Sequence, residues 1–236
     1  MIKTQNLSKN FDGILAVDDL TFSVEPGEVL GFLGPNGAGK STTMRMLAGF
    51  IHPTAGLASI CGHDVVQDAI AARAALGYLP EGAPHYAEMT VGAFLDFIAD
   101  LRGLRGAQRK TRLDYVIGRL QLADVFAQTI DTLSKGFKRR VGLAQAIVHD
   151  PRVLILDEPT DGLDPLQKHE VRTLIGEIAR EKTIIISTHI LEEVDAVCTR
   201  AIIIARGKLV ADGTPAALKA QAPSGRLDDV FRAVAA

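Results

Sequence analysis

The sequence is poor in cysteine and has no excess of basic residues, and each shortage excludes a class of protein. Only Cys61 and Cys198 occur among 236 residues, too few for a disulfide framework, so a reduced cytosolic compartment is expected. Lysine and arginine number 26 against 28 aspartate and glutamate residues, giving a net charge of −2. General nucleic-acid binders usually show a strong basic excess, so we expect no nucleic-acid partner.

Long apolar runs are also missing. The strongest are "VLIL" and "AIIIA", whereas a membrane-spanning helix takes about 20 residues. The stretch "MIKTQNLSKNFDG" at the N-terminus has no apolar run suited to a signal peptide. We therefore expect a globular protein that crosses no membrane by itself and that would serve a membrane only through a partner.

What the sequence does contain is an alternation of strand and helix patterns, which predicts a parallel sheet with helical crossovers. Helices are expected at about 39–48 and 67–75, between the later strands, and in short pieces over 214–236 with a break at 223–225. From about 89 to 148 helical patterns follow one another, so this block is interpreted as an insertion. The expected strands are 2–7, 20–24, 29–33, 58–61, 77–79, 153–156, 183–187, 201–205 and 208–211.

A glycine-rich segment, "GPNGAGKST", follows the apolar strand 29–33 and precedes a helix, which is the setting of a P-loop. Its glycines let backbone N–H groups turn toward phosphates without obstruction by a Cβ atom. Lys40 would bridge the β- and γ-phosphates, the Ser41 hydroxyl would bind Mg²⁺, and Thr42 could reach the α-phosphate. The alternative is a strand-to-helix turn without a ligand. The candidate residues are Gly34, Pro35, Asn36, Gly37, Ala38, Gly39, Lys40, Ser41 and Thr42.

A P-loop needs a second anchor for Mg²⁺, and "VLILDEP" supplies one. Four apolar residues form a buried strand with Asp157 at its carboxyl end, where ligands bind in open α/β sheets. Asp157 would hold Mg²⁺ through water, and Glu158 is placed to orient and polarise an attacking water. The alternative is a pair of solvated carboxylates at a strand end.

A second anion site is predicted at "TLSKGFKRRVG", nearly a hundred residues after the P-loop. Ser134 is a good N-cap, and the start of the helix is small and cationic, which favours anion binding at its N-terminus. Taken alone, this segment would be interpreted as an ordinary capped helix with a basic first turn.

Together these motifs resemble the ATP-binding subunit of an ABC transporter over nearly the whole chain. "GPNGAGKST" resembles the Walker A loop and "LILDEP" the Walker B strand; "GYLPEGAP", "LSKGF", "DGLDP" and "STHI" occupy the Q-loop, signature, D-loop and switch-histidine positions. The resemblance implies an α/β fold: a P-loop NTPase core with a parallel sheet, an antiparallel β subdomain and an inserted α-helical subdomain. Residues 1–236 would form one nucleotide-binding domain, with the helical subdomain at about 84–150.

In this family two nucleotide-binding subunits meet head to tail, so each ATP lies between one P-loop and the other subunit's signature helix. By resemblance, Ser134 and Gly136 would bind the γ-phosphate held by a partner's Lys40. Asp164 in the D-loop would link the two halves of the dimer. His189 would hydrogen-bond the γ-phosphate and help to fix the catalytic carboxylate and the water.

Two further positions follow from the resemblance. Phe11, just after the first strand, resembles the aromatic residue that stacks on adenine, an interaction worth about 1–3 kcal/mol in nucleic-acid systems; its alternative is a residue packed at the β-edge. Glu81 stands where the family usually has glutamine. A carboxylate there could contact Mg²⁺ directly, as a hypothesis, although it adds negative charge beside a polyanion.

The signature also departs from the commonest Leu-Ser-Gly-Gly-Gln, with Lys135 and Phe137 in place of a glycine and the glutamine. "YLPE", "LSKG" and the closing "GRLDDVF" resemble the ATPases of ABC-2-type exporters, whose membrane subunits are separate polypeptides. The implied function is hydrolysis of ATP to ADP and phosphate, with Mg²⁺, coupled to translocation of a substrate, with export favoured over import.

The implied partners are a membrane permease and either a second copy of the chain or a paralogous ATPase, on the cytoplasmic face of the cell membrane. The alternative function is a non-transport ABC ATPase that acts as a mechanical switch on ribosomes or nucleic acid. Such relatives usually carry two ATPase domains or a long coiled-coil insertion, and neither pattern is found here. A P-loop kinase or GTPase would lack the signature, D-loop and switch-histidine segments. The transported substrate is not encoded in these motifs.

Overall fold

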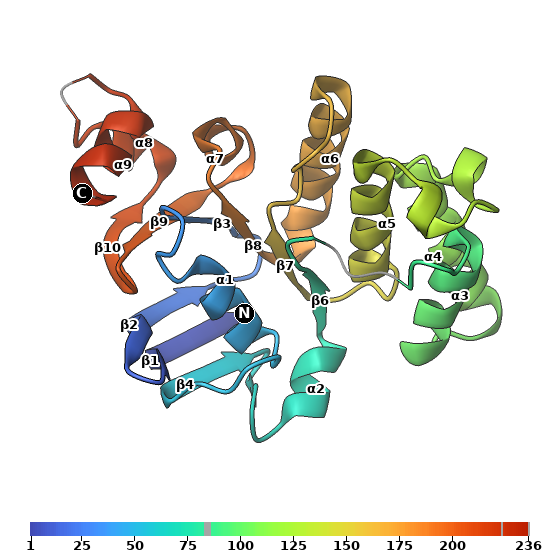
Figure 1. Cartoon of the computed structure of the whole chain (residues 1–236), viewed down its shortest axis with the longest axis horizontal. Helices are drawn as coiled ribbons and strands as arrows, with labels where there is room; N and C mark the ends of the chain where they lie inside the picture. Colours follow the sequence, from blue (N-terminus) through green and yellow to red (C-terminus); the bar gives the residue numbers. More distant parts are fainter. Residues whose placement is uncertain (83–85, 223, 236) are drawn as a thin grey trace.

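The computed structural model describes residues 1–82, 86–222 and 224–235, arranged around two β-sheets (Figure 1). The strands are β1 Ile2–Phe11, β2 Ile14–Val24, β3 Val29–Leu33, β4 Ala55–Ile60, β5 His63–Asp64, β6 Leu76–Leu79, β7 Val153–Asp157, β8 Thr183–Thr188, β9 Arg200–Ala205 and β10 Lys208–Gly213. The α-helices are α1 Lys40–Leu47, α2 Ala69–Ala74, α3 Val91–Leu101, α4 Gly106–Arg119, α5 Lys135–Ile147, α6 Pro165–Ile178, α7 Leu191–Val197, α8 Pro215–Lys219 and α9 Leu227–Ala235. Short 3-10 turns are η1 Ala123–Val125, η2 Ile130–Thr132 and η3 Ala179–Glu181.

The larger sheet has the strand order β10-β9-β3-β8-β7-β6. Its strands pair in parallel, except that β10 runs antiparallel to β9. Every residue of β3, β7 and β8 is buried, because helices and the smaller sheet cover the two faces. Near-continuous apolar runs are the pattern of such doubly covered parallel strands. The parallel sheet predicted from the sequence is confirmed.

The smaller sheet is antiparallel, with the order β2-β1-β4-β5. The alternation predicts strands at 2–7 and 20–24, and both prove longer. Asn6 adopts a left-handed φ of 49° and the pairing register shifts around it, which interrupts the alternation of apolar and polar residues. Asp12 and Gly13 both have positive φ, 48° and 95°, as a two-residue type I′ hairpin turn requires. Phe11, expected just after the first strand, is therefore its last residue.

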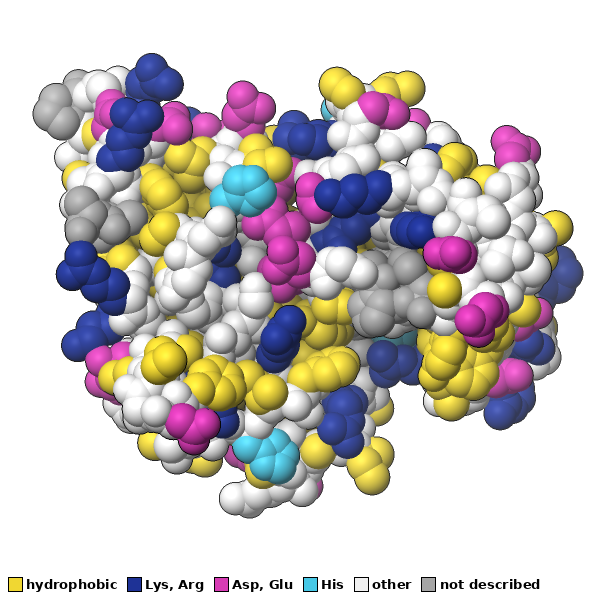
Figure 2. All heavy atoms as spheres, in the orientation of Figure 1, with side chains coloured by type: hydrophobic (Ala, Val, Ile, Leu, Met, Phe, Trp, Pro, Cys, Tyr) yellow, Lys and Arg dark blue, Asp and Glu magenta, His cyan; other side chains and the backbone are white. Residues whose placement is uncertain are grey.

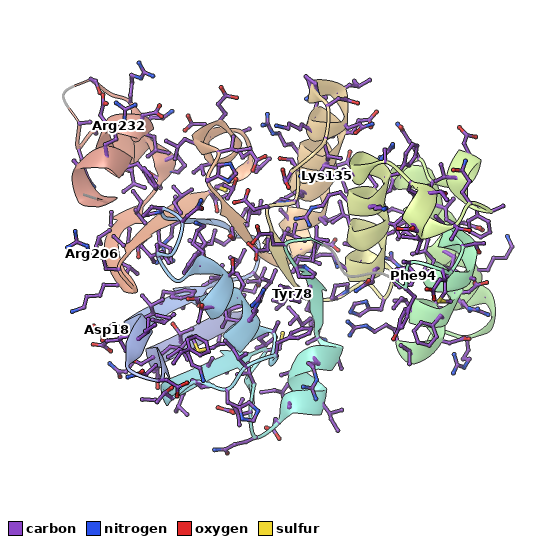
Figure 3. All side chains as sticks on the ribbon, in the orientation of Figure 1. Asp18, Tyr78, Phe94, Lys135, Arg206 and Arg232 are labelled. Carbon is purple, nitrogen blue, oxygen red and sulfur yellow. The ribbon has the colours of Figure 1, made fainter. Side chains whose placement is uncertain are left out.

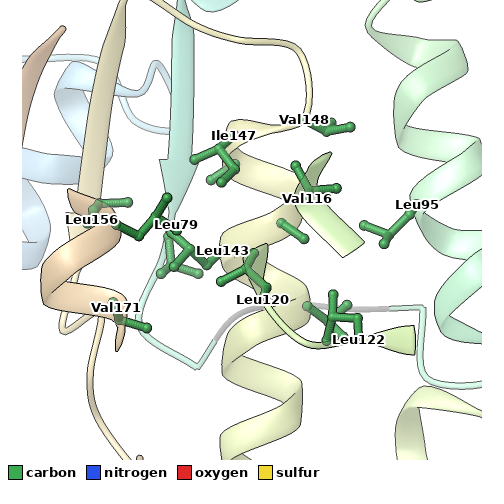
Figure 4. Close-up of a cluster of buried hydrophobic side chains, with 14 of the residues drawn as sticks. Leu79, Leu95, Val116, Leu120, Leu122, Leu143, Ile147, Val148, Leu156 and Val171 are labelled. Atoms are coloured by element: carbon green, nitrogen blue, oxygen red, sulfur yellow. The ribbon is translucent and has the colours of Figure 1, made fainter. Parts of the chain in front are cut away.

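Helices α3, α4 and α5 lie together beyond the β6 edge of the larger sheet (Figure 1). Their buried side chains meet those of the sheet in one apolar cluster, which extends from Leu156 and Leu79 through Leu143 to Val116 and Leu95 (Figure 4). The described part of 89–148 is helical apart from loops and one isolated bridge between Thr90 and Thr129. The expected start of this block near 84 lies outside the described residues.

Helix α5 approaches the sheet closely near its C-terminal end. A Cβ atom built on Gly77 of β6 would overlap the carbonyl oxygen of Ala146. Only glycine lets the backbones of α5 and β6 approach so closely. At its other end α5 begins beside α6, where Lys135 is found (Figure 3).

The C-terminal helices α8 and α9 pack against β9 and β10, with Leu218, Leu227 and Val230 buried among them. Pro223, at the break expected between short helices, lies outside the described residues. Over the ranges that the structure describes, no helix has both the length and the hydropathy needed to cross a membrane.

Candidate active site

The carboxyl ends of three adjacent parallel strands bring the predicted site residues together. Strands β3, β8 and β7 are neighbours, with Leu33 paired to Thr188 and Asp157 paired to Ser187. The P-loop follows β3, Glu158 follows β7 and His189 follows β8. They surround a cleft of about 470 Å³ whose lining is Ala16, Asn36, Gly37, Gly39, Lys40, Ser41, Thr42, Glu81, Asp157, Glu158, Asp161 and His189.

The P-loop turns into α1 through residues that require positive φ. Gly39 has φ 104°, and a Cβ atom there would overlap the carbonyl oxygen of Ala16. The loop wraps around the Lys40 ammonium, whose Nζ donates to the carbonyl oxygens of Gly34 at 2.6 Å and Pro35 at 3.1 Å. The lysine at the first position of α1 is thus fixed in the concave side of the loop, where backbone N–H groups and the helix N-terminus favour an anion.

Burial and nearby carboxylates act in opposite directions on the pKa of Lys40. Burial lowers the pKa of the ammonium, while the carboxylates of Glu158, Asp157 and Glu81 act to raise it, and burial prevails. In the view of Figure 2, acidic side chains lie next to a histidine and to basic side chains near the middle of the visible surface. A lysine in a cleft whose pKa is shifted by burial and by neighbouring carboxylates is typical of a functional site, and its ammonium is suited to a polyanionic ligand.

Two carboxylates end β7 in different environments. Asp157 is buried, and its Oδ1 accepts a hydrogen bond from Ser187 Oγ at 2.7 Å. Glu158 has a left-handed φ of 52°, and its N–H donates to the Ser187 carbonyl oxygen at 2.8 Å. Its Oε1 lies 2.8 Å from His189 Nδ1. The imidazole therefore holds the Glu158 carboxylate against the cleft, as expected for a carboxylate that orients water.

A buried polar cluster beneath this pair was not predicted from the sequence. Glu193 on α7 is only 2% exposed, and it accepts hydrogen bonds from Thr160 Oγ1 and, at 2.7 Å, from Thr188 Oγ1. Burial raises the pKa of the Glu193 carboxyl. The Thr188 hydroxyl also lies 3.5 Å from Glu158 Oε2. The available signal was the pair of polar residues ending an apolar strand, followed five positions later by an acid.

The second predicted anion site lies away from this cleft. Ser134 caps α5, its Oγ accepting from Phe137 N at 3.3 Å, as predicted. Neither Ser134 nor Gly136 is among the described residues that line the cleft. The start of α5 contacts the D-loop of its own chain: Lys135 Nζ lies 2.8 Å from Oδ2 of Asp161, which lines the cleft. Ser134 and Gly136 therefore lie outside the cleft of their own chain, while Lys135 reaches its edge.

Three other predicted residues have clear positions. Asp164 caps α6, its Oδ1 accepting from Gln167 N at 2.9 Å. Phe11 is 43% exposed, with the Lys9 ammonium 4.9 Å from its ring centroid, and is not among the described residues lining the cleft. Glu81 does line the cleft, two residues beyond β6. A role for each in nucleotide binding stays a prediction.

The donors available to a metal ion are oxygen atoms. The Ser41 hydroxyl and the Asp157 carboxylate line the same cleft, and hard oxygen ligands are those that Mg²⁺ prefers. Within the described ranges, no group of three histidine, cysteine or acidic side chains converges as a metal site. The residues fit a Mg²⁺ ion that keeps waters and binds substrate phosphates.

The sequence matches the family described as "ABC transporter" over residues 17–161, more than half of the chain. It is 37% identical over 230 residues to the probable multidrug ABC transporter ATP-binding protein YbhF of Escherichia coli (strain K12), covering 97% of this chain and 40% of that protein. It is 41% identical over 215 residues to the Nod factor export ATP-binding protein I of Burkholderia pseudomallei (strain 1710b), covering 91% of this chain and 71% of that protein. The chain thus spans less than half of the first relative.

Solved structures give the same result. The fold is similar to the "Structure of ATP binding subunit of ABC transporter", with a TM-score of 0.91, 31% identity and 99% of both chains covered. The dimeric cassette MJ0796 has a TM-score of 0.84 at 23% identity, with 91% of this chain covered, which is a likeness of fold. The predicted fold class and the resemblance stated from the motifs are both confirmed. The chain belongs to the ABC transporter family, as one of its ATP-binding domains.

Proposed function

We propose that this chain hydrolyses ATP to ADP and phosphate and thereby drives export by a separate membrane permease. The observation that carries the proposal is the meeting of Lys40, Asp157, Glu158 and His189 in one cleft at the ends of adjacent strands. The names of the relatives, a multidrug transporter component and a Nod factor export protein, support export; membership of the ABC-2 branch is proposed from the sequence motifs alone.

The residues of the cleft divide the work of phosphoryl transfer to water. The P-loop amides and Lys40 bind the phosphates and stabilise the charge that develops on them. Glu158, held by His189, orients and polarises the attacking water. Mg²⁺ bound by Ser41 and, through water, by Asp157 would neutralise phosphate charge. Phe11 is proposed to contact the adenine, and Glu81 to contact the metal or its water.

We propose a head-to-tail dimer because the signature segment lies outside the cleft of its own chain. The capped, cationic start of α5, with Ser134 and Gly136, would meet the γ-phosphate bound by a second subunit. ATP then favours the closed dimer, because it contacts both subunits in that state, and hydrolysis removes the preference. The dimeric relative of the same fold, MJ0796, supports this arrangement.

The permease is proposed to dock in a second hollow, a groove of about 380 Å³ between β6 and α3. Two of its apolar residues are strongly exposed, Phe50 at 68% and Leu101 at 67%. Tyr78 lies on β6 (Figure 3), and its ring centroid is 5.5 Å from that of Phe50. Pro80 in the groove directly precedes Glu81 in the ATP cleft, so one short segment joins the two sites. A helix end of a permease, at the cytoplasmic membrane face, is the proposed occupant.

The Glu158→Gln variant tests this function. It keeps the shape of the side chain but removes the base, so we expect ATP hydrolysis to fall by about 100-fold or more while ATP accumulates in a stable dimer. The matched control is Glu192→Gln, an exposed acid on α7 outside the cleft. A Glu158→Gln protein that stays monomeric at saturating ATP and Mg²⁺ would contradict the head-to-tail site.

Copurification from native membranes tests the partner. A polytopic membrane protein recovered with the tagged chain at about equal stoichiometry supports the transport function. Recovery of ribosomes or nucleic acid instead would favour the mechanical-switch alternative.

A further inference from the structure

Helix α5 carries a buried arginine whose contacts all lead to the catalytic segments. Arg139 is 6% exposed. Its Nη1 donates to the Pro80 carbonyl oxygen at 2.8 Å, and its Nη2 donates to the carbonyl oxygens of Asp157 and Glu158. One guanidinium therefore joins α5 to the ends of β6 and β7. A planar group with several fixed donors is suited to holding separate carbonyls in one geometry.

These carbonyls belong to the backbone that presents the active-site carboxylates. Pro80 directly precedes Glu81, and Asp157 and Glu158 are themselves residues of the cleft. The Glu158 N–H is already bound to the Ser187 carbonyl oxygen, so Arg139 fixes the residue from its other side. Both backbone groups of Glu158 are thus held, one of them by α5, while His189 holds the carboxylate itself. A displacement of α5 would therefore move the backbone from which the Glu158 side chain extends.

The opposite end of the same helix carries the proposed contact with a second subunit. Arg139 follows the cap residue Ser134 by five positions, which is about 7.5 Å along a helix axis. A helix is stiff over this length. A change at the cap is therefore passed to the carbonyls that Arg139 holds.

We propose that Arg139 is a positioning residue through which α5 reports the nucleotide bound in the partner's site to Glu158 of its own site. The inference rests on the proposed dimeric ATPase and extends it: Arg139 is not among the described residues that line the cleft, and its guanidinium contacts Glu158 through the backbone carbonyl. Burial lowers the pKa of Arg139, opposed by nearby acids of which Asp157 is the strongest, so the buried cation is sustained by the same carboxylates that it positions.

The next residue on the helix is a matched control. Arg140 is 5% exposed, but its Nη1 donates to the Leu120 carbonyl oxygen and to Gln121 Oε1, both at 3.2 Å, and its guanidinium lies 4.3 Å from the Phe137 ring centroid. Both hydrogen-bond partners belong to the helical part of the chain. Arg140→Gln therefore measures the cost of losing a buried guanidinium without disturbing the Glu158 backbone.

The decisive experiment uses mixed dimers with one hydrolysing site, assembled from two differently tagged subunits. One subunit keeps Glu158, and the other carries Glu158→Gln. Arg139→Gln is placed either in the subunit with the intact Glu158 or in the other one. We expect hydrolysis to fall by about 100-fold only in the first case, the scale of a displacement of about 1 Å at a catalytic group.

A merely structural role predicts a different result. The subunit with Glu158→Gln supplies the signature helix to the active nucleotide, so a damaged helix would reduce hydrolysis when Arg139→Gln is placed there. Equal losses in the two arrangements, or a loss matching that of Arg140→Gln, would overturn the proposal. The mixed dimer without a substitution at Arg139 must itself hydrolyse ATP. If it does not, the result contradicts the proposed dimeric ATPase rather than the role of Arg139 within it.

Two further measurements complete the test. In the symmetric dimer we expect the rate to depend cooperatively on ATP concentration, with a Hill coefficient that falls in Arg139→Gln and is unchanged in Arg140→Gln. Arg139→Lys retains the charge but not the fork of donors. We therefore expect this variant to fold and to keep part of the hydrolysis rate that Arg139→Gln loses. Full activity in a folded Arg139→Gln protein would also overturn the proposal.

Discussion

Replacing Glu193 with alanine probes the buried cluster that lies under the catalytic carboxylate. Glu193 links Thr160, directly before the D-loop, to Thr188, at the end of β8, because its carboxylate accepts a hydrogen bond from each hydroxyl. Alanine would remove the acceptor and leave two buried hydroxyls in place. The Thr188 hydroxyl would then have Glu158 Oε2, 3.5 Å away, as its nearest described carboxylate.

The expected cost follows from one donor that loses its partner and one that keeps a poorer one. A buried polar group without a partner costs about 1–3 kcal/mol, which applies in full to the Thr160 hydroxyl, whereas the Thr188 hydroxyl can still donate to Glu158 at the longer distance of 3.5 Å. Relief of the buried carboxylate, whose desolvation raises the Glu193 pKa, acts in the opposite direction. We therefore expect Glu193→Ala to lower the free energy of unfolding by about 1–3 kcal/mol, and Glu193→Gln by less than about 1 kcal/mol.

Urea unfolding at neutral pH, with ATP hydrolysis measured in parallel, checks this expectation. The alanine variant should also hydrolyse ATP more slowly, because a hydrogen bond from Thr188 makes Glu158 less basic. The folded-state pKa of Glu193 is raised, so its contribution to the free energy of unfolding decreases as pH rises above the ordinary pKa of a glutamate. The unsubstituted protein should therefore lose stability relative to Glu193→Gln as pH rises. Equal stability of the alanine and glutamine variants would refute the hydrogen-bond account.

Three other substitutions have expected outcomes. His189→Ala removes the 2.8 Å partner of Glu158, and the ATP turnover number should fall by about 100-fold with nucleotide affinity little changed; an equal fall in affinity would contradict this. Gly39→Ala places a side chain at φ 104° against the Ala16 carbonyl, so a nucleotide titration should show binding lost, and unchanged affinity would refute the steric argument. Burial lowers the pKa of His149 to about 4, so stability should fall as pH drops from 6.5 toward 4, by at most about 3 kcal/mol; a His149→Gln protein with the same slope, measured by urea unfolding, would contradict it.

Sequence patterns located the cleft because its residues follow buried strands. Lys40, Glu158 and His189 each come directly after a short apolar run or its turn, and parallel neighbours bring such ends to one edge. Arg139 and Glu193 have no comparable signal. Their partners lie 18 to 59 residues away for Arg139 and 5 to 33 residues away for Glu193, so only tertiary packing shows what they hold.

The hairpin of β1 and β2 shows a different limit. Alternation ends at Asn6 because a left-handed residue turns the following side chains to the other face. An Asp-Gly pair flanked by apolar residues is a strong hairpin signal, and the structure has its turn at 12–13. The expected strands 2–7 and 20–24 did not include this turn, because they were based on periodicity and not on turn chemistry.

The close approach between Gly77 and Ala146 fixes α5 near its C-terminal end, so a tilt of the helix would pivot about this contact. Ala146, at the close contact, and Gly136, near the N-terminal end of α5, are ten residues apart, or about 15 Å along the helix. A tilt of about 4° about Ala146 would move Gly136 by about 1 Å and Arg139 by about 0.7 Å. Any residue bulkier than glycine at position 77 would displace the point about which α5 tilts. It would therefore change how far a given tilt moves Arg139 and the Glu158 backbone that it holds.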